Sequence, residues 1–181
     1  MSRLKPWREV SRETLLDCRV FQVEKSVTQS PVDDREHDFF RVRNDDWVQI
    51  VPVTSNEELV MVRQFRHGSQ SFVLEVPGGL VDPGEAPSQA AARECLEETG
   101  YQTGELLGIG AVNPNPAIHT SRLHSFYAPD VVPAGAVQET STEQTEVVLV
   151  PVSDVEDLLR AGKIDHALVV ATLWRFLADR R

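Results

Sequence analysis

The stretch GGLVDPGEAPSQAAARECLEETGY, from Gly78 to Tyr101, decides how the rest of the chain is interpreted. Its first part is rich in glycine and proline, which favours a tight loop. From Pro87 onward, small apolar and charged residues follow a helical spacing, with proline in the first turn and Gly100 just past the end. This pattern predicts a helix over residues 87–99. Gly78 and Gly79 are expected to form a turn that ends a preceding strand.

Three glutamates share one face of this predicted helix. Glu94, Glu97 and Glu98 stand at positions i, i+3 and i+4, and residues at that spacing are neighbours on a helix surface. Three adjacent carboxylates repel one another unless a cation lies between them, and Mg²⁺ or Mn²⁺ prefers such oxygen ligands. A solvated acidic helix face is the alternative. Arg93 is spaced to pair with Glu97 and to reach back to Glu85, which would tie the loop to the helix.

The spacing of Gly79, Glu85 and the run from Arg93 to Tyr101 resembles the Nudix box. The resemblance implies an α+β fold, the Nudix α/β/α sandwich with a central mixed β-sheet. It also implies Mg²⁺-dependent hydrolysis of a nucleoside diphosphate linked to another group, with Mn²⁺ as a substitute. By position, Glu94 and Glu98 correspond to the principal metal ligands. Glu97 corresponds to a further ligand or water organiser, and the Gly78 carbonyl to an additional contact.

Flanking residues are similar to one subgroup of that family. The segments Val62–Gly68 and Leu74–Gly79 resemble those of ADP-ribose pyrophosphatases and nucleotide-sugar hydrolases, and Pro116 follows Tyr101 by 15 residues, as in ADP-ribose-type members. The resemblance implies that Arg66 binds substrate phosphate or ribose. Its planar guanidinium suits a diphosphate, although a solvent-exposed arginine is the alternative. Glu75 is expected near the terminal sugar or a metal-bound water.

A catalytic base is expected in the polar loop before the strand at residues 145–152. In similar dimeric ADP-ribose hydrolases, a glutamate of this loop orients or deprotonates the attacking water. Counting back from the strand assigns that role to Glu143, with Glu139 and Glu146 as rivals.

The N-terminal region, residues 1–45, is expected to form a β region distinct from the hydrolase domain at 46–181. Similar enzymes use this region to dimerise and to clamp the nucleobase. Arg41 is therefore a candidate substrate contact, and Arg43 fits about equally well. Strands are predicted at residues 38–43, 47–54, 58–65, 104–112, 122–128 and 145–152.

Two further helices are predicted near the C-terminus. Ser153 and Glu156 have the spacing of a capping box, which predicts a short helix up to Arg160. Asp165 is expected to cap a last helix over residues 166–179, whose many apolar residues indicate that it is largely buried.

Composition narrows the possible partners. The 181 residues include 18 Lys and Arg against 28 Asp and Glu, so the formal charge is −10. A duplex-binding protein needs a positive surface, so no nucleic-acid partner is expected. No apolar run approaches the ~20 residues of a membrane span. The two cysteines form no disulfide framework and no apolar stretch follows the basic N-terminus, so a cytoplasmic location is expected.

The leading hypothesis is therefore a hydrolase that splits ADP-ribose or a nucleotide sugar such as GDP-mannose into a nucleoside monophosphate and a sugar phosphate. The alternative is a non-catalytic domain that senses ADP-ribose. A scaffold with an acidic surface helix does not explain the glycine loop. The sequence leaves open which nucleobase and which sugar are preferred.

Overall fold

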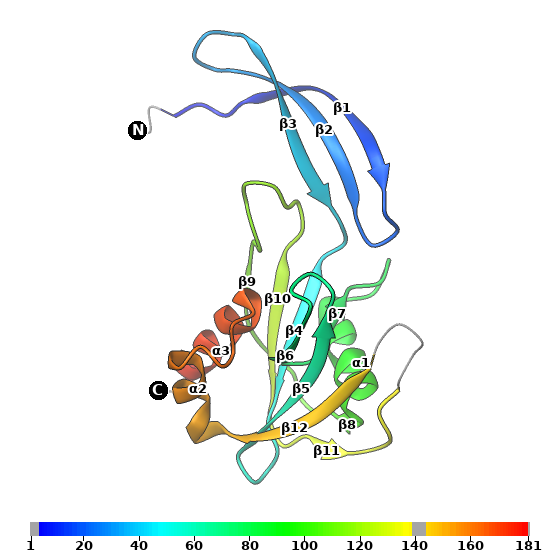
Figure 1. Ribbon diagram of the computed structural model, residues 1–181, viewed down its shortest axis with the longest axis vertical. Helices are drawn as coiled ribbons and strands as arrows, with labels where there is room; N and C mark the ends of the chain where they lie inside the picture. Colours follow the sequence, from blue (N-terminus) through cyan, green and yellow to red (C-terminus); the bar gives the residue numbers. More distant parts are fainter. Residues whose placement is uncertain (1–3, 139–143, 181) are drawn as a thin grey trace. The chain divides into compact units, whose positions relative to one another are not determined.

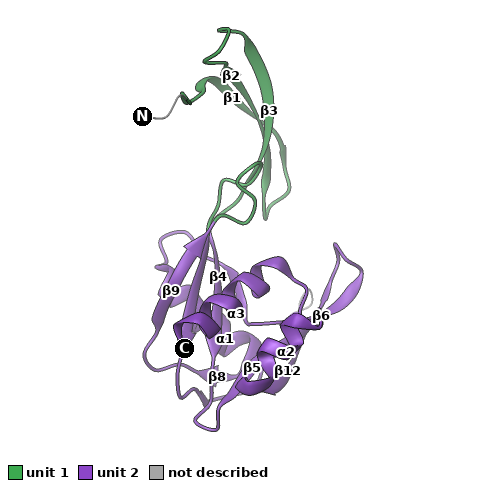
Figure 2. Cartoon of the chain, turned by 90° about the vertical axis from the view of Figure 1, so that its left-hand side faces the viewer, with its two compact units in different colours: residues 1–45, 113–122 green, residues 46–112, 123–181 purple. Residues whose placement is uncertain are grey.

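The computed structural model describes residues 4–138 and 144–180. These residues form two compact units, coloured separately in Figure 2. Unit 1 comprises residues 1–45 and 113–122, and unit 2 comprises residues 46–112 and 123–181. The short segment 113–122, which the sequence alone assigned to the hydrolase domain, thus belongs with the N-terminal strands.

Unit 2 is built on a mixed sheet and an antiparallel sheet (Figure 1). The mixed sheet has the order β7-β4-β10-β9, in which β10 runs parallel to β4, and the antiparallel sheet has the order β12-β5-β6. Strands β8 and β11 form a small separate pair. The strands of unit 2 are β4 (Trp47–Pro52), β5 (Glu58–Arg66), β6 (Ser71–Glu75), β7 (Gly78–Leu80), β8 (Tyr101–Gln102), β9 (Leu107–Val112), β10 (Leu123–Ala128), β11 (Val132–Pro133) and β12 (Thr145–Pro151).

Helices cover both faces of these sheets. They are α1 (Pro87–Thr99), α2 (Val155–Arg160) and α3 (Ala167–Asp179), with a short 3₁₀ turn, η1 (Val152–Asp154), before α2. Successive residues of a strand point to opposite faces. In β4, Val48 and Ile50 accordingly pack with α1, whereas Val51 packs with α2 and α3. The α/β/α layering with a central mixed sheet, expected from the sequence, is confirmed.

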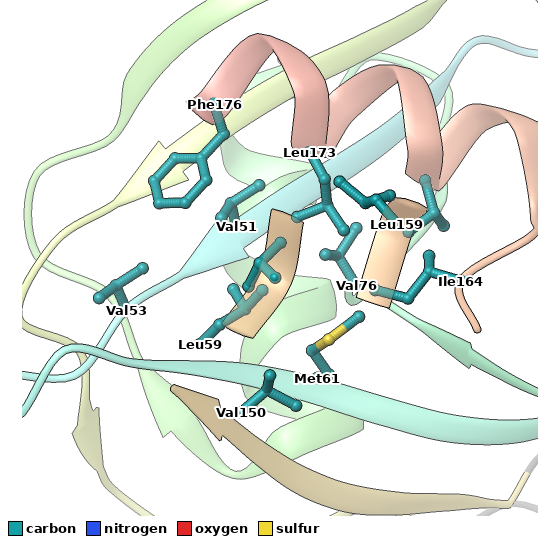
Figure 3. Close-up of a cluster of buried hydrophobic side chains, with 12 residues drawn as sticks. Val51, Val53, Leu59, Met61, Val76, Val150, Leu159, Ile164, Leu173 and Phe176 are labelled. Atoms are coloured by element: carbon teal, nitrogen blue, oxygen red, sulfur yellow. The ribbon is translucent and has the colours of Figure 1, made fainter. Parts of the chain in front are cut away.

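The larger apolar core lies between the sheets and the C-terminal helices (Figure 3). Leu173 and Phe176 from α3 are fully buried there against Val51 of β4 and Met61 of β5. Burial of each such side chain contributes about 1.5–3 kcal/mol. This core covers the face of the sheets opposite to α1 and fixes the strands from that side.

Local predictions succeed or fail with the tertiary contacts. Helix α1 begins and ends as predicted, at Pro87 and Thr99. The expected glycine turn is wrong, because Gly78 and Gly79 belong to strand β7 and pair with Gln49 and Val48 of β4. A cross-strand partner 30 residues away in the sequence thus overrides the local turn tendency.

The two predicted C-terminal helices exist, but their predicted caps are wrong. The Ser153 hydroxyl donates to Asp154 Oδ1 at 2.8 Å inside the 3₁₀ turn, and no side chain caps α2. The residue at the N-cap of α3 is His166 rather than Asp165, and it also makes no side-chain capping bond.

Unit 1 is a three-stranded antiparallel sheet of order β1-β2-β3, formed by β1 (Arg8–Asp17), β2 (Gln22–Gln29) and β3 (Glu36–Arg43). The segment 113–122 joins it through backbone bonds from Val42 N to Ile118 O (2.8 Å) and from Thr120 N to Val42 O (3.2 Å). Within that segment, Asn115 Oδ1 accepts from Ala117 N at 3.2 Å. This Asx-type turn gives Asn115 a structural role.

No helix in the described part of the chain is long and apolar enough to cross a bilayer.

Candidate active site

Helix α1 is fixed at both ends and along one side. The backbone N–H of Ala86 donates to Gln89 Oε1 at 3.0 Å, and Gly100 closes the helix in a left-handed conformation with φ of 71°. Ala90, Ala91 and Cys95 are fully buried in the cluster shared with β4 and β5. Because that side is anchored, the glutamates of the helix are held in defined positions.

Two of the glutamates lie directly against strand β7. A Cβ atom on Gly79 would stand 2.4 Å from Glu94 Oε1, and one on Gly78 would stand 2.3 Å from Val48 O. The contact at Gly78 is with backbone, so glycine is required there, whereas a side chain at Gly79 would displace the Glu94 carboxylate. The Gly78 N–H donates to Glu98 Oε2 at 2.9 Å, and Glu98 is 6% exposed. Gly78 therefore lets β7 lie close to the backbone of β4, and Gly79 leaves space for the Glu94 carboxylate.

Arg93 ties the helix to the preceding loop, as the sequence predicted. Its guanidinium donates to Glu85 through Nε (3.1 Å) and Nη2 (3.0 Å), and to Leu80 O at 3.1 Å. Its Nη1 reaches Glu94 Oε1 at 2.8 Å and Glu97 Oε2 at 3.2 Å. These contacts, led by the bond to Glu85, raise the pKa of Arg93, and Arg93 in turn lowers the pKa of Glu85.

The donor set of α1 fits the expected Mg²⁺. Glu94, Glu97 and Glu98 offer carboxylate oxygens beside the backbone of Gly78, and hard oxygen ligands are those that Mg²⁺ and Mn²⁺ prefer. Over residues 4–138 and 144–180, no group of three or more Asp, Glu, His or Cys side chains is arranged to hold a metal ion. The Glu94 and Glu97 carboxylates are instead held by Arg93, which partly offsets their repulsion.

Arg66 and Glu75 lie on the side of the sheet that α1 covers. Val60 of β5 packs with α1, and strand alternation sets Val62 and Arg66 on that same face. Glu75 is the cross-strand partner of Val62 and is 1% exposed. Arg66 grips both oxygens of Glu75, with Nε to Oε1 and Nη2 to Oε2 each at 2.7 Å. The structure thus brings these two predicted residues together on the face that carries the α1 glutamates.

Glu75 also contacts a residue that sequence reasoning did not single out. His166 Nδ1 lies 3.2 Å from Glu75 Oε2. Burial alone would raise the pKa of Glu75, but the hydrogen bonds from Arg66 and then the nearby ring of His166 outweigh it and lower the pKa to about 2. The two residues are 91 positions apart, so no local signal in the sequence could have identified this contact.

The candidate bases are only partly within the described residues. Glu139 and Glu143 lie outside them. Glu146 is on β12, where Val148 packs with α2 and α3, so alternation directs Glu146 to that same face, away from α1. Its carboxylate pairs with Arg63 at 3.1 Å. Glu146 therefore lies on the face of the sheet opposite to α1.

The candidate arginines of unit 1 differ in their surroundings. Arg41 pairs with Glu9 and with the buried Glu24, each at 3.1 Å, and its side chain is 26% exposed. Arg43 is 60% exposed and stands 3.9 Å from Glu24. Both therefore belong to one ionic network, in which Arg43 is the more accessible member.

Cys95 has a packing role. It is fully buried, and this burial raises the pKa of its thiol to about 11. A thiol at that pKa carries almost no thiolate at neutral pH, so Cys95 is not a nucleophile.

Comparison with known proteins gives consistent matches. A family model described as the NUDIX domain matches residues 43–173. The ADP compounds hydrolase NudE of Escherichia coli is 29% identical over 163 residues, covering 90% of this chain and 87% of that protein. The ADP-ribose pyrophosphatase of Bacillus subtilis is 34% identical over 115 residues, covering 62% and 60%. A crystal structure of an ADP compounds hydrolase superposes with a TM-score of 0.86 at 26% identity, covering 98% of this chain and 96% of that one.

Proposed function

The chain belongs to the Nudix family and is a Nudix pyrophosphohydrolase, and from that premise we propose that it cleaves ADP-ribose or a related nucleoside diphosphate sugar. The products would be a nucleoside monophosphate and a sugar phosphate. The relatives named for ADP compounds and ADP-ribose support this choice. The observation that carries it is the placement of Arg66 on the same side of the sheet as the α1 glutamates, since a diphosphate needs both a cation site and a positive side chain.

In the proposed reaction, Glu94 and Glu98 would hold Mg²⁺, and Glu97 and the Gly78 carbonyl would contribute further oxygens. Mn²⁺ has the same ligand preference and would substitute. When bound, such an ion neutralises phosphate charge and lowers the pKa of a coordinated water. Glu97 is 39% exposed, more than the other two glutamates of the helix. Its carboxylate is therefore the best placed to orient a water.

Arg66 is proposed to bind the diphosphate of the substrate. Two of its five N–H groups are engaged by Glu75, and its side chain is still 43% exposed. An arginine fixed in this way presents a preset charged plane to an anion, which lowers the entropy cost of binding. Glu75 is 1% exposed, so its proposed part is to aim Arg66, and contact with the terminal sugar remains the further expectation from the family resemblance.

Proton removal from the attacking water is proposed for Glu143. Its rival is Glu139, since Glu146 faces the other side of the sheet. A carboxylate in that role takes the proton of the water as the new phosphorus–oxygen bond forms. The bond from that phosphorus to the bridging oxygen breaks, and the other half of the substrate leaves as its monophosphate. Such a base typically contributes 10²–10⁴-fold to the rate.

We further propose that unit 1 makes the chain a homodimer. One face of its sheet carries an apolar patch of Leu16, Val23, Phe40 and Val42, in which Leu16 pairs with Val23 and Val23 pairs with Val42. The same face also carries the Lys25–Asp38 ion pair (2.8 Å), because Lys25 is the cross-strand partner of Phe40. Leu16 and Phe40 are each 56% exposed. A three-stranded sheet needs a covered apolar face to be stable, and a second copy of the same sheet would cover it. Arg41, with Arg43 as its alternative, is proposed to reach the nucleobase of the partner's substrate.

The expected compartment is the cytoplasm. Cys18 and Cys95 are both free, as is usual for proteins of reducing compartments. The formal charge of −10 supports a small-molecule substrate over nucleic acid.

A substrate panel tests the proposed function. Purified full-length chain is incubated with ADP-ribose, ADP-glucose, GDP-mannose and UDP-glucose, each with Mg²⁺, with Mn²⁺ and with a chelator. Chromatography should detect a nucleoside monophosphate and a sugar phosphate in equal amounts, dependent on the metal and fastest for an ADP-linked substrate. Tight binding of ADP-ribose without any turnover would instead indicate a sensor and would refute the hydrolase proposal.

A further inference from the structure

The last turn of helix α1 carries two of the three glutamates proposed to bind the cation. Glu97 and Glu98 stand directly before Thr99, where the helix ends. The final carbonyl groups of a helix have no donor within the helix, so the last turn frays unless donors from elsewhere hold it. The positions of these two glutamates therefore depend on what holds the end of α1.

Two carbonyl groups of this turn accept hydrogen bonds from a distant part of the chain. Glu97 O accepts from the backbone N–H of Gln138 at 2.8 Å. Glu98 O accepts from the hydroxyl of Thr145, the first residue of β12, also at 2.8 Å. The donor from Thr145 is a side chain, so a substitution can remove it without changing the backbone.

Strand pairing sets Thr145 on the face of the sheet that α1 covers. Thr145 is the cross-strand partner of Gln64, which shares a face of β5 with Arg66. Val147, the next residue on the same face of β12, packs with the apolar cluster of α1. The register of β12 on β5 therefore directs the hydroxyl of Thr145 to the end of the helix.

Glu98 is held both at its side chain and at its backbone. Its carboxylate accepts from the N–H of Gly78 at 2.9 Å, and its carbonyl accepts from Thr145. Gly78 belongs to the mixed sheet, and Thr145 belongs to the antiparallel sheet. A side chain held only at its carboxylate can move as the last turn frays, whereas a second bond to the backbone opposes that motion.

We propose that Thr145 is a positioning residue, which holds the last turn of α1 and thereby fixes Glu98 beside Gly78. The inference rests on the proposed function, in which the α1 glutamates bind Mg²⁺ or Mn²⁺. Thr145 acts through the backbone of Glu98 and contacts neither the cation nor the substrate. Groups that orient metal ligands typically contribute 10–100-fold to metal affinity, so loss of the hydroxyl should weaken cation binding.

The test compares three variants with the wild-type chain. Thr145→Val replaces the hydroxyl with a methyl group of similar volume, and Thr145→Ser keeps the hydroxyl. Thr54→Val is the matched control, because Thr54 Oγ1 accepts from Asn56 N and Glu58 N, each at 3.3 Å, in the turn before β5.

Three quantities are measured for each protein. The Kd for Mn²⁺ comes from the electron paramagnetic resonance signal of the free ion. The second quantity is the Mn²⁺ concentration that gives half-maximal hydrolysis of ADP-ribose. The third is the hydrogen-exchange rate of the backbone amides of α1 in the metal-free protein, which reports fraying of the helix.

We expect Thr145→Val to raise the Kd and the half-maximal Mn²⁺ concentration by roughly tenfold. The amides of Thr99 and Gly100 should exchange faster, and those of the first turns of α1 should not change. Thr145→Ser should remain within about threefold of wild type, and Thr54→Val should match wild type in all three quantities. Should Thr145→Val fail to fold, Thr145→Ala replaces it, because alanine also lacks the hydroxyl and the same changes are expected.

The inference is overturned if the variant without the hydroxyl binds Mn²⁺ as the wild type does, or if amide exchange in the last turn is unchanged. It is also overturned if Thr145→Ser loses as much affinity as Thr145→Val, or if Thr54→Val weakens Mn²⁺ binding equally. Failure of the proposed function is distinguishable, because the wild-type chain itself would then neither bind Mn²⁺ nor hydrolyse ADP-ribose.

Discussion

Each of the two units buries a glutamate against an arginine, yet the surroundings of the two pairs are opposite in character. In unit 2, Glu75 and Arg66 lie beside two apolar clusters that fill both faces of the sheets. In unit 1, Glu24 and Arg41 lie in an interior that is polar. The buried residues of the described part of unit 1 are Glu24, Ser26, Ser30 and Ser121.

This difference shows which unit buries enough apolar surface to be stable by itself. The free energy that holds a fold together comes mainly from apolar burial, and unit 2 has that burial within its own chain. Unit 1 leaves Leu16 and Phe40 more than half exposed, so its apolar surface is stabilising only once something covers it. The ion pairs inside unit 1 orient the side chains that they join. They contribute little net stability by themselves.

The largest effect on stability is expected from removing the arginine of the Glu75–Arg66 pair, because no second arginine in the described part of the chain pairs with Glu75 to replace it. Arg66→Leu leaves the buried Glu75 with His166 alone and should lower the free energy of unfolding by about 3–5 kcal/mol. Arg41→Leu should cost only about 1 kcal/mol, because Arg12 and Arg43 each remain 3.9 Å from Glu24. Urea unfolding of the full chain measures both. Equal losses would show that the two surroundings do not differ as described.

The Glu75–Arg66 pair also makes the free energy of unfolding depend on pH. The pKa of Glu75 is about 2 in the folded chain against an ordinary value of 4.5. The unfolded chain therefore takes up this proton first, and the stabilisation is fully present above pH 4.5 and is lost as the pH falls toward about 2.

In that range the wild-type chain should lose about 3 kcal/mol more stability than Glu75→Gln, whose side chain does not titrate. Urea unfolding of both proteins at steps between pH 5.5 and 2.5, values chosen to bracket the transition, measures this difference. Parallel curves for the two proteins would contradict the assignment.

The two faces of the antiparallel sheet in unit 2 provide the next contrast. Glu98→Gln should lower kcat/KM by at least about 100-fold, because it removes a charge from the α1 face where the metal is proposed. The fold should persist, since a glutamine oxygen can still accept from the Gly78 N–H. Glu146→Gln, on the opposite face, should remain within about twofold of wild type. Steady-state kinetics with Mg²⁺ measure kcat/KM for both variants. Comparable losses of kcat/KM would refute the assignment of the reaction to the α1 face.

The parts of the fold that could be predicted from the sequence are those whose determining residues lie within one short segment. The ends of α1 and the Arg93–Glu97 pair were predictable, because proline, glycine and i, i+4 spacing act within one segment. Strand β1 was not predicted, since all of its residues are exposed and no alternation marks it. It exists because its backbone pairs with β2.

The site divides in the same way. The α1 glutamates were placed by their spacing, whereas His166 and Glu75 meet only after α3 packs on the core. The strand pairing of Gly78 and Gly79 was likewise a consequence of β4 lying beside them. Contacts between distant segments depend on the packing of the whole unit, and a spacing rule along one segment carries no information about them.

The smallest expected effect separates the two faces of the sheet in unit 1. Phe39 and Phe40 are consecutive, so they point to opposite faces, and they are 45% and 56% exposed. Phe40 lies with Val42 in the apolar patch of one face, which we call the apolar face, whereas Phe39 lies with Arg41 on the ionic face and stacks edge-on against Trp7. If a second copy covers the apolar face, Phe40→Ser should raise the dimer dissociation constant by about tenfold.

Phe39→Ser is the matched control, with the same residue type and the same strand but the other face, and it should leave the dissociation constant unchanged. Analytical ultracentrifugation over a range of concentrations gives both values. A larger effect from Phe39→Ser would mean that the ionic face is the one covered. Arg41 and Arg43 both lie on that face, so the route of either side chain to a nucleobase would then run through the interface itself.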